Sequence, residues 1–178
     1  PPAPKSGPKS RRLTGSADAG VPQRVCASVD LPRVGSKIVV RLASKRPGHS
    51  RSVLVARVDK QEVTALDSRC FHANGPLETG DIEDIGDDNV GQRRCVVCPV
   101  HHYHLDLRTG EFLYKGFDPV RKKSAGWKNA GARQRVHRAW ESEGGVFVEL
   151  SEDGLEVPSD KFAELPDACE GDGCDLML

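Results

Sequence analysis

Residues 70–77 read CFHANGPL, and residues 94–107 read RCVVCPVHHYHLDL. Each segment places a cysteine and a histidine within one tight turn: Cys70 and His72 form a C-x-H motif, and Cys98 and His101 form a C-x-x-H motif. The two motifs are separated by 25 residues. Two thiolates and two imidazoles, supplied by two loops, suit either a tetrahedral zinc ion or an iron–sulfur cluster in which histidines replace two of the cysteines.

The pairing of one cysteine with one histidine in each loop favours the cluster. Zinc fingers usually pair cysteine with cysteine and histidine with histidine. In a two-iron cluster one iron can take both thiolates and the other both imidazoles, so that each loop contributes one ligand to each iron. We therefore predict a 2Fe–2S cofactor held by Cys70, His72, Cys98 and His101, with a structural zinc protein as the alternative. Ordinary core cysteines and histidines are the least favoured interpretation.

Short β-branched runs surround the two motifs, and no segment keeps an apolar period of 3.6 residues. Strands are expected at residues 37–42, 52–58, 61–66, 94–97, 103–107, 134–140 and 146–150. Asp59-Lys60 and residues 141–145 have the length and composition of hairpin turns. The pattern predicts an all-β sandwich or barrel of about seven to ten strands with very little helix.

The two ends of the chain differ from its middle in composition. Residues 1–24 are rich in proline and basic residues, which indicates a disordered arm, with the remnant of an organelle transit peptide as the alternative. Residues 151–178 carry a net charge of −8, which indicates an acidic, disordered tail. The folded domain is therefore expected at residues 25–150, with the metal-binding subdomain at about 68–114.

Positive charge gathers between residues 115 and 138, where eight lysines and arginines stand against the single acid Asp118. This stretch predicts a surface on which an acidic protein partner docks. Nucleic-acid binding is disfavoured because no recognition motif is present and only Trp127 lies nearby to stack on a base. The longest apolar runs, such as residues 52–56, are far too short to span a bilayer, so no membrane association is expected.

The motifs and their flanks resemble the soluble Rieske-type ferredoxins, the Rieske iron–sulfur domain-containing proteins. The resemblance covers residues 37–150 and rests on the segments CFHANGPLETGDIED (70–84), GQRRCVVCPVHHYHLDLRTGEFLYKG (91–116) and KNAGARQRVHRAW (128–140). It implies a Rieske fold of three stacked antiparallel sheets with an inserted cluster-binding subdomain. It also implies that Cys70 and Cys98 bind the buried iron and that His72 and His101 bind the outer iron.

The chain departs from the respiratory and photosynthetic Rieske proteins near the cluster. They carry a further cysteine in each loop, whereas this chain has Gly75 and residues 100–102, so no disulfide can join the loops. Their cluster-facing serine is replaced by Tyr103. Fewer donors to the cluster predict a potential toward the lower end of the range of about −150 to +300 mV.

Other cysteines and histidines are not assigned as ligands. His102 and His104 are interpreted as surface or supporting residues, and Cys95 as a buried structural thiol rather than half of a redox dithiol with Cys98. Free thiols are expected at Cys26 and, in the acidic tail, at Cys169 and Cys174.

The expected function is electron transfer: a soluble intracellular carrier, in the cytoplasm or an organelle, that takes single electrons from a reductase and passes them to an acceptor such as an oxygenase. The chain is expected to be a component of an oxidoreductase system rather than an enzyme by itself. A Rieske-fold scaffold subunit in a larger assembly is the alternative from a different class.

Overall fold

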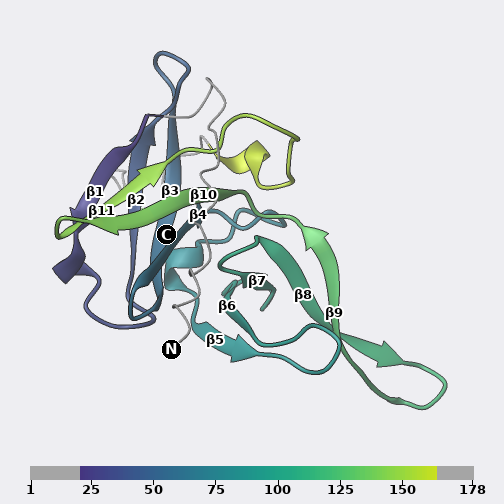
Figure 1. Cartoon of the computed structure of the whole chain (residues 1–178). Helices are drawn as coiled ribbons and strands as arrows, with labels where there is room; N and C mark the ends of the chain where they lie inside the picture. The colour runs from purple at the N-terminus through teal and green to yellow at the C-terminus, as the bar shows by residue number, and fades with distance from the viewer. Residues whose placement is uncertain (1–20, 164–178) are drawn as a thin grey trace, which may run out of the picture.

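The computed structural model describes residues 21–163, which form eleven β-strands in two antiparallel sheets (Figure 1). Helical structure in this range consists of three 3-10 turns: η1 (Ser28–Asp30), η2 (Leu77–Thr79) and η3 (Asp160–Phe162). Within residues 21–163 no helix has the length and apolar character to cross a bilayer. The all-β prediction is confirmed, with one strand more than the expected maximum.

Six strands form the base of the molecule, in the order β1-β11-β10-β4-β3-β2. They are β1 (Gln23–Ala27), β2 (Lys37–Ala43), β3 (Ser50–Asp59), β4 (Glu62–Asp67), β10 (Val136–Ser142) and β11 (Gly145–Glu149). Strand β10 pairs with β4 through its first two residues and with β11 through its last five. Strand β10 therefore divides the base into two parts, β1-β11-β10 and β10-β4-β3-β2, which together with the second sheet make three antiparallel layers of strands.

The two free edges of the base are linked by one side chain. The amide of Gln23 in β1 donates to the carbonyl of Ala43 in β2 at 2.9 Å and accepts from the Ala43 N–H at 3.0 Å. A carboxamide presents the same donor and acceptor as a peptide bond. Gln23 thus satisfies edge groups that would otherwise be open to another strand, and the base becomes barrel-like.

The second sheet is inserted between β4 and β10 and runs in the order β5-β6-β7-β8-β9. Its strands are β5 (Ile82–Ile85), β6 (Arg93–Val97), β7 (His104–Asp106), β8 (Glu111–Asp118) and β9 (Lys123–Ala132). The expected subdomain at about residues 68–114 ends within β8, which continues to Asp118 and pairs with β9 along most of its length.

Strands β8 and β9 form a long hairpin that projects from the body of the molecule (Figure 1). The sequence suggested only a basic connection here, because β9 reads KSAGWKNAGA and contains no β-branched residue. Pairing with β8 produces the strand in spite of this weak local preference, as β propensity depends strongly on context. The same reason explains why the short, charged strand β5 was not predicted.

A hydrophobic core joins the two sheets. Leu54, Ala56, Val58 and Leu66 from the base pack with Val96, Leu105 and Leu107 from the inserted sheet and with Leu77 of η2. The same cluster includes Cys70 and Cys98, each 1% exposed. The two cysteines are therefore held by the main interface between the sheets, rather than by mobile loops alone.

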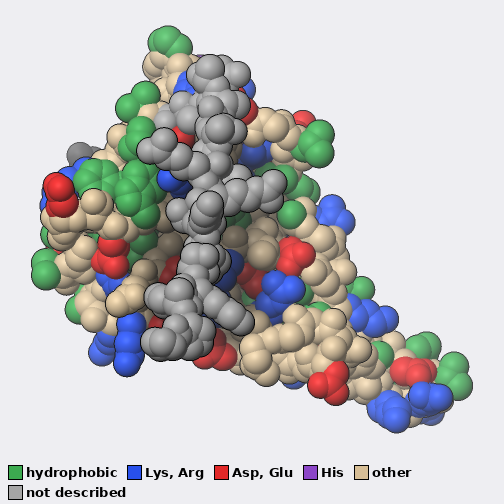
Figure 2. Space-filling model, in the orientation of Figure 1, with side chains coloured by type: hydrophobic (Ala, Val, Ile, Leu, Met, Phe, Trp, Pro, Cys, Tyr) green, Lys and Arg blue, Asp and Glu red, His purple; other side chains and the backbone are tan. Residues whose placement is uncertain are grey.

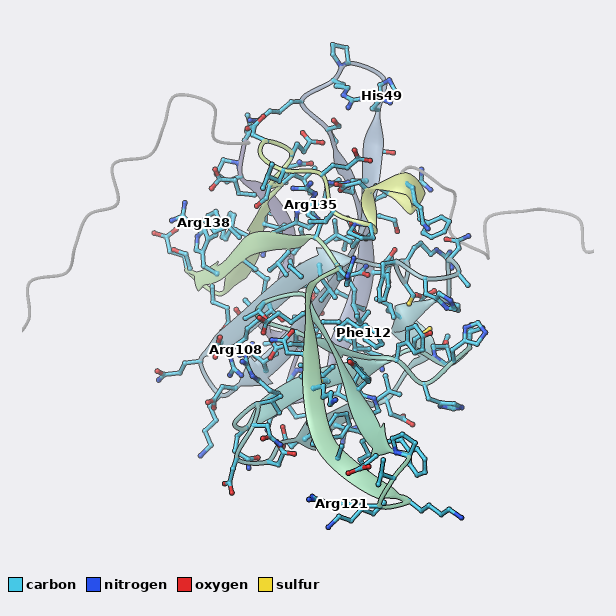
Figure 3. All side chains as sticks on the ribbon, turned by 90° about the vertical axis from the view of Figure 1, so that its right-hand side faces the viewer. His49, Arg108, Phe112, Arg121, Arg135 and Arg138 are labelled. Atoms are coloured by element: carbon cyan, nitrogen blue, oxygen red, sulfur yellow. The ribbon has the colours of Figure 1, made fainter. Side chains whose placement is uncertain are left out.

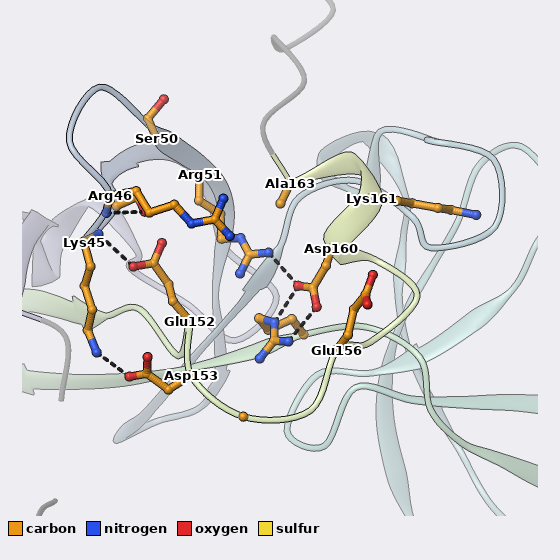
Figure 4. Close-up of a pocket in the computed structure, with 13 residues that line it drawn as sticks. Lys45, Arg46, Ser50, Arg51, Glu152, Asp153, Glu156, Asp160, Lys161 and Ala163 are labelled. Atoms are coloured by element: carbon orange, nitrogen blue, oxygen red, sulfur yellow. Dashed lines mark hydrogen bonds and ion pairs between the residues drawn. The ribbon is translucent and has the colours of Figure 1, made fainter. Parts of the chain in front are cut away.

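The C-terminal segment folds back onto the base, although the sequence suggested that an acidic tail starts at residue 151. Ser159 is fully buried, and its hydroxyl donates to the buried carboxylate of Asp67 at 2.5 Å. Asp160 accepts from Arg51 at 2.6 Å and from Arg135 at 2.5 Å, beside a cavity of about 560 Å³ (Figure 4). The acidic composition of this segment did not predict the contact, because Arg51 and Arg135, which bind Asp160, lie far from it in the sequence. The predictions for residues 1–20 and 164–178 lie outside the described residues.

Asp160 provides a test of this attachment. Burial acts to raise the pKa of its carboxyl, but hydrogen bonds from Arg135, the Val157 amide and Arg51 lower it from 3.8 to about 2. Because the folded-state pKa is depressed, the stabilisation is complete above about pH 4 and is lost as the pH falls toward 2. We expect Asp160→Asn to lower the free energy of unfolding at pH 7 by about 1–3 kcal/mol.

Urea unfolding of the wild type and the variant between pH 7 and pH 2 measures this effect. The control is Asp153→Asn, since Asp153 pairs with Lys45 but is 62% exposed, and it should cost less than about 1 kcal/mol. A difference between wild type and Asp160→Asn that does not shrink in acid would contradict the assignment.

Candidate metal centre

The first candidate loop, residues 70–75, lies between β4 and η2 and is closed by two backbone hydrogen bonds. The Cys70 N–H donates to the Gly75 carbonyl at 2.9 Å, and the Asn74 N–H donates to the Cys70 carbonyl at 3.1 Å. Asn74 adopts a φ of 58°, a left-handed conformation that asparagine tolerates better than most residues. His72 lies in the middle of this turn.

The second candidate loop, residues 98–103, joins β6 to β7 and repeats the same turn. The Cys98 N–H donates to the Tyr103 carbonyl at 2.9 Å, and the His102 N–H donates to the Cys98 carbonyl at 2.8 Å. His102 has a φ of 56° and occupies the position of Asn74 in the first loop. His102 is therefore a turn residue, and its exposed side chain agrees with the prediction of a surface role.

The two thiols of the loops meet in the interior. Burial raises the pKa of Cys70 to about 12, the nearby Cys98 thiol contributes in the same direction, and the N–H groups of His72 and Ala73 oppose the rise by hydrogen-bonding to its sulfur. A side chain at Gly75 would enter the same space, since an added Cβ would lie 2.7 Å from the Cys98 sulfur. The sulfurs thus occupy a dry site that the backbone approaches closely on two sides.

The two imidazoles meet at the surface. His72 and His101 are both exposed, and their Nδ1 atoms lie 3.2 Å apart with ring centroids 4.7 Å apart. A tetrahedral metal with bonds of about 2.0–2.1 Å to nitrogen needs two ligand atoms about 3.3 Å apart. The spacing of the two Nδ1 atoms fits two ligands of one metal ion.

The four predicted residues thus come together as two pairs, with thiols inside and imidazoles outside. In the described part of the chain, no three histidine, cysteine or acidic side chains converge closely enough to hold one metal ion. The pairs suit a centre with two metal positions, one bound by sulfur and one by nitrogen. The residues present therefore fit a 2Fe–2S cluster, in which Cys70 and Cys98 would face one iron and His72 and His101 the other.

Aromatic rings pack next to the exposed imidazole pair. Tyr103 stacks on Phe112 of β8 with centroids 4.6 Å apart, and its ring lies 4.7 Å from that of His72. Phe71 packs against both Tyr103 and Phe112. These contacts connect the first loop, the second loop and the hairpin, and they hold the His72 ring in a defined orientation. Figure 3 shows Phe112 where the hairpin leaves the body of the protein.

A buried glutamine in the segment between β9 and β10 holds the first loop. Gln134 is 1% exposed, and its side-chain nitrogen donates at 2.7 Å to the carbonyls of both Asp67 and Arg69. Its side-chain oxygen accepts from the Phe71 N–H at 3.1 Å. Sequence reasoning missed this residue, because a glutamine in a strand-like run has the pattern of a surface position.

A cavity of about 600 Å³ lies beside the second loop, between it and the start of the hairpin. Its walls include His101, Tyr103, Phe112 and Trp127. The rings of His104 and Trp127 meet in a T-shaped contact with centroids 4.9 Å apart, and the Lys115 ammonium lies over the Trp127 ring, 5.2 Å from its centroid. The cavity therefore combines an aromatic lining with a cation next to the exposed imidazole pair.

The structure places Cys95 away from the metal centre. Its side chain is fully buried in a small cluster with Ile85 and Leu113, whereas Cys98 lies in the core between the sheets. Burial raises the pKa of Cys95 to about 12. Cys95 is buried, as predicted. Among the described cysteines, Cys26, Cys70, Cys95 and Cys98 form no disulfide, and Cys169 and Cys174 lie outside the described residues.

The basic stretch at 115–138 does not form one surface. Arg135 is 9% exposed and is committed to Asp160, and Arg138 pairs with Glu149 on the base. The exposed lysines and arginines of the hairpin are Lys115, Arg121, Lys122, Lys123 and Lys128. The candidate docking surface is therefore smaller than the sequence suggested, and it lies on β8 and β9.

This chain is similar to known proteins in sequence and in fold. A human protein named "Rieske domain-containing protein" is 38% identical over 116 residues, which are 65% of this chain and 70% of the relative. In a solved structure from Mycobacterium tuberculosis, a chain named as an NADH-dependent nitrite reductase small subunit superposes with a TM-score of 0.55 at 22% identity, covering 76% of this chain and all of that one. This superposition confirms the predicted Rieske fold.

A chain in the solved complex of reduced oxygenase and oxidised ferredoxin of carbazole 1,9a-dioxygenase has 23% identity and a TM-score of 0.49, covering 77% of this chain and 99% of that one. The family described as soluble Rieske-type ferredoxin matches residues 37–153, which include both candidate loops and all of the inserted sheet. The chain therefore belongs to the soluble Rieske-type ferredoxin family.

Proposed function

We propose that this protein is a one-electron carrier whose 2Fe–2S cluster is bound by Cys70 and Cys98 on the inner iron and by His72 and His101 on the outer iron. The observation that carries the proposal is the division of the four side chains into a buried thiol pair and an exposed imidazole pair with Nδ1 atoms 3.2 Å apart. Membership of the family supports the same cofactor. When bound, the cluster supplies reversible one-electron chemistry.

The protein's own groups have distinct parts in this function. Backbone N–H groups of His72 and Ala73 stabilise negative charge on the Cys70 sulfur. Neutral imidazoles leave the centre less negative than four thiolates would, so an added electron meets less repulsion. The exposure of His72 and His101 brings the outer edge of the centre to the surface, where a partner can approach it.

The proposed partners are a reductase that donates the electron and an acceptor such as an oxygenase, so the protein acts as a component of an oxidoreductase system. We assign docking to the hairpin base, defined as Lys115, Trp127 and Lys128, together with the aromatic cavity beside His101. In this arrangement Lys115 and Trp127 face each other across the β8–β9 ladder, and the cavity reaches from them to His101. The two lysines of the hairpin base would attract an acidic partner surface.

Substitution of the ligands tests the cofactor assignment. Protein purified without oxygen should contain about two irons and two sulfides per chain and give a Rieske-type EPR signal after reduction. Cys70→Ser should abolish the cluster. His72→Cys should either abolish it or shift its potential toward the value of about −400 mV typical of all-cysteine clusters.

The matched control is Cys95→Ala, which removes a buried thiol outside the centre and should leave iron content and EPR signal unchanged. A colourless protein that contains zinc, or a His72→Cys variant with unchanged redox behaviour, would rule out the proposed ligation.

Gly75 offers a test of the packing around the inner pair. In Gly75→Ala the new methyl group would lie 2.7 Å from the Cys98 sulfur and 3.0 Å from a methyl of Val100, so one of them must move. We expect a reduced iron content or a shifted reduction potential, with the fold retained by circular dichroism. Gly91→Asn is the control, since an added Cβ meets nothing within 4 Å there and asparagine tolerates the left-handed φ of 67° at this position. Normal cluster loading and potential in Gly75→Ala would show that the site is looser than the structure indicates.

The docking surface is tested by charge reversal and salt. Lys115→Glu combined with Lys128→Glu should slow reduction by a candidate reductase by about ten-fold at low ionic strength and should flatten the dependence of the wild-type rate on salt. The control is Arg33→Glu combined with Lys60→Glu, which reverses the same number of charges on the six-stranded base, away from the hairpin. It should have little effect on the rate of reduction. A wild-type rate that does not respond to salt would remove the docking assignment.

A further inference from the structure

The tip of the β8–β9 hairpin, defined as residues 117–123, exposes apolar and basic side chains together. Phe117 is 66% exposed and Val120 is 90% exposed. Arg121, Lys122 and Lys123 follow directly and are all exposed. Figure 2 shows hydrophobic and basic side chains side by side at this projecting end. Exposed apolar side chains that lie together and are bordered by charged residues are typical of an interaction site.

The hairpin tip is held in a defined turn. The Asp118 carboxylate accepts hydrogen bonds from the N–H groups of Val120 and Arg121, both at 3.0 Å. Asp118 and Lys123 are paired across the ladder. The one acidic side chain of the tip is thereby used to shape the turn, and it sets the position of the exposed apolar and basic residues.

The tip lies far from the metal centre. Phe112, which packs on Tyr103, and Val120 are eight residues apart along the hairpin, a path of up to about 26 Å in an extended strand. Figure 3 shows Arg121 at the end of the hairpin opposite Phe112. A partner that contacted only the tip would be remote from His72 and His101. Binding at the tip therefore does not serve direct electron exchange.

We propose that the hairpin tip binds an anionic phospholipid surface, with Phe117 and Val120 entering the boundary between headgroups and acyl chains and with Arg121, Lys122 and Lys123 contacting the headgroups. Charge complementarity favours this occupant, because anionic headgroups attract clustered lysines and arginines. Shape favours it too. A stable protein interface needs about 1,000 Å² or more of matched surface, whereas a fluid lipid surface accepts a thin convex turn without a matching groove.

Such binding is peripheral and differs from the expectation of no membrane association, which rested on the lack of a long apolar run. A turn with two apolar side chains needs no such run, because it enters only the interfacial layer. Attachment through the tip leaves the hairpin base and the exposed imidazoles available to a redox partner. The inference does not depend on the proposed electron transfer.

Co-sedimentation of the full chain with lipid vesicles tests the proposal. The wild type should bind vesicles of phosphatidylcholine that contain about one third phosphatidylserine and should not bind phosphatidylcholine alone. Binding should weaken as salt is raised from about 0.05 to 0.5 M. Neutralising the tip with Arg121→Gln, Lys122→Gln and Lys123→Gln should weaken it about 100-fold. Phe117→Ser with Val120→Ser should weaken it about ten-fold or more.

The matched control removes three positive charges elsewhere: Arg33→Gln, Arg46→Gln and Lys60→Gln, which are exposed on the base. It should bind as the wild type does. No binding to anionic vesicles, or equal losses in the tip and control variants, would overturn the proposal and leave an acidic protein as the occupant of the tip.

A second measurement reports insertion directly. Val120→Trp places a fluorophore at the most exposed apolar position of the tip. Its emission should shift to the blue when anionic vesicles are added and should be quenched by lipids brominated on the acyl chains. An unchanged spectrum with protein bound would contradict insertion of the tip. The variant's visible absorption should match that of the wild type, because the tip is distant from the loops.

Discussion

The contact between the Cys70 and Cys98 thiols inside the protein is the constraint on which the rest of the site depends. The two thiols that we propose as ligands are held in a dry core, where burial is the largest cause that raises the pKa of Cys70 to about 12. Such a site is costly unless a metal and hydrogen bonds compensate for the lost water. The two loops answer this demand by turning N–H groups toward sulfur and by keeping side chains out of the space at Gly75.

The position of the thiols follows from the way the two sheets pack. Cys70 follows β4 of the base, and Cys98 directly follows β6 of the inserted sheet, so the core between the sheets brings them together. Gln134, in the segment that returns to the base, adds a polar link, because its side chain bonds the carbonyls of Asp67 and Arg69 just before the first loop and the Phe71 N–H within it. The segment that follows the hairpin thus stabilises the first loop of the site.

Charge is distributed by structure rather than by position in the sequence. Arg135 belongs to the basic stretch, yet it is buried against Asp160 from the acidic stretch, and this pair fastens residues 157–163 to the base. The remaining cations gather on β8 and β9. They fall into two groups with different surroundings: Lys115, which lies over Trp127, and Lys128, which is paired with Tyr114 across the ladder, belong to the hairpin base, whereas Arg121 to Lys123 accompany exposed apolar residues at the tip.

The local sequence was sufficient to predict the all-β class, most strands of the base, and the two ligand motifs at Cys70–His72 and Cys98–His101. It sufficed because period-two apolar runs and mixed Cys/His spacing are properties of a few neighbouring residues. Tertiary structure alone decided that Gln134 is buried, that β9 is a strand, and that Asp160 meets Arg51 and Arg135. Each of these depends on contacts between residues distant in the chain, and the free energy of such contacts outweighs the weak local preferences that a sequence pattern records.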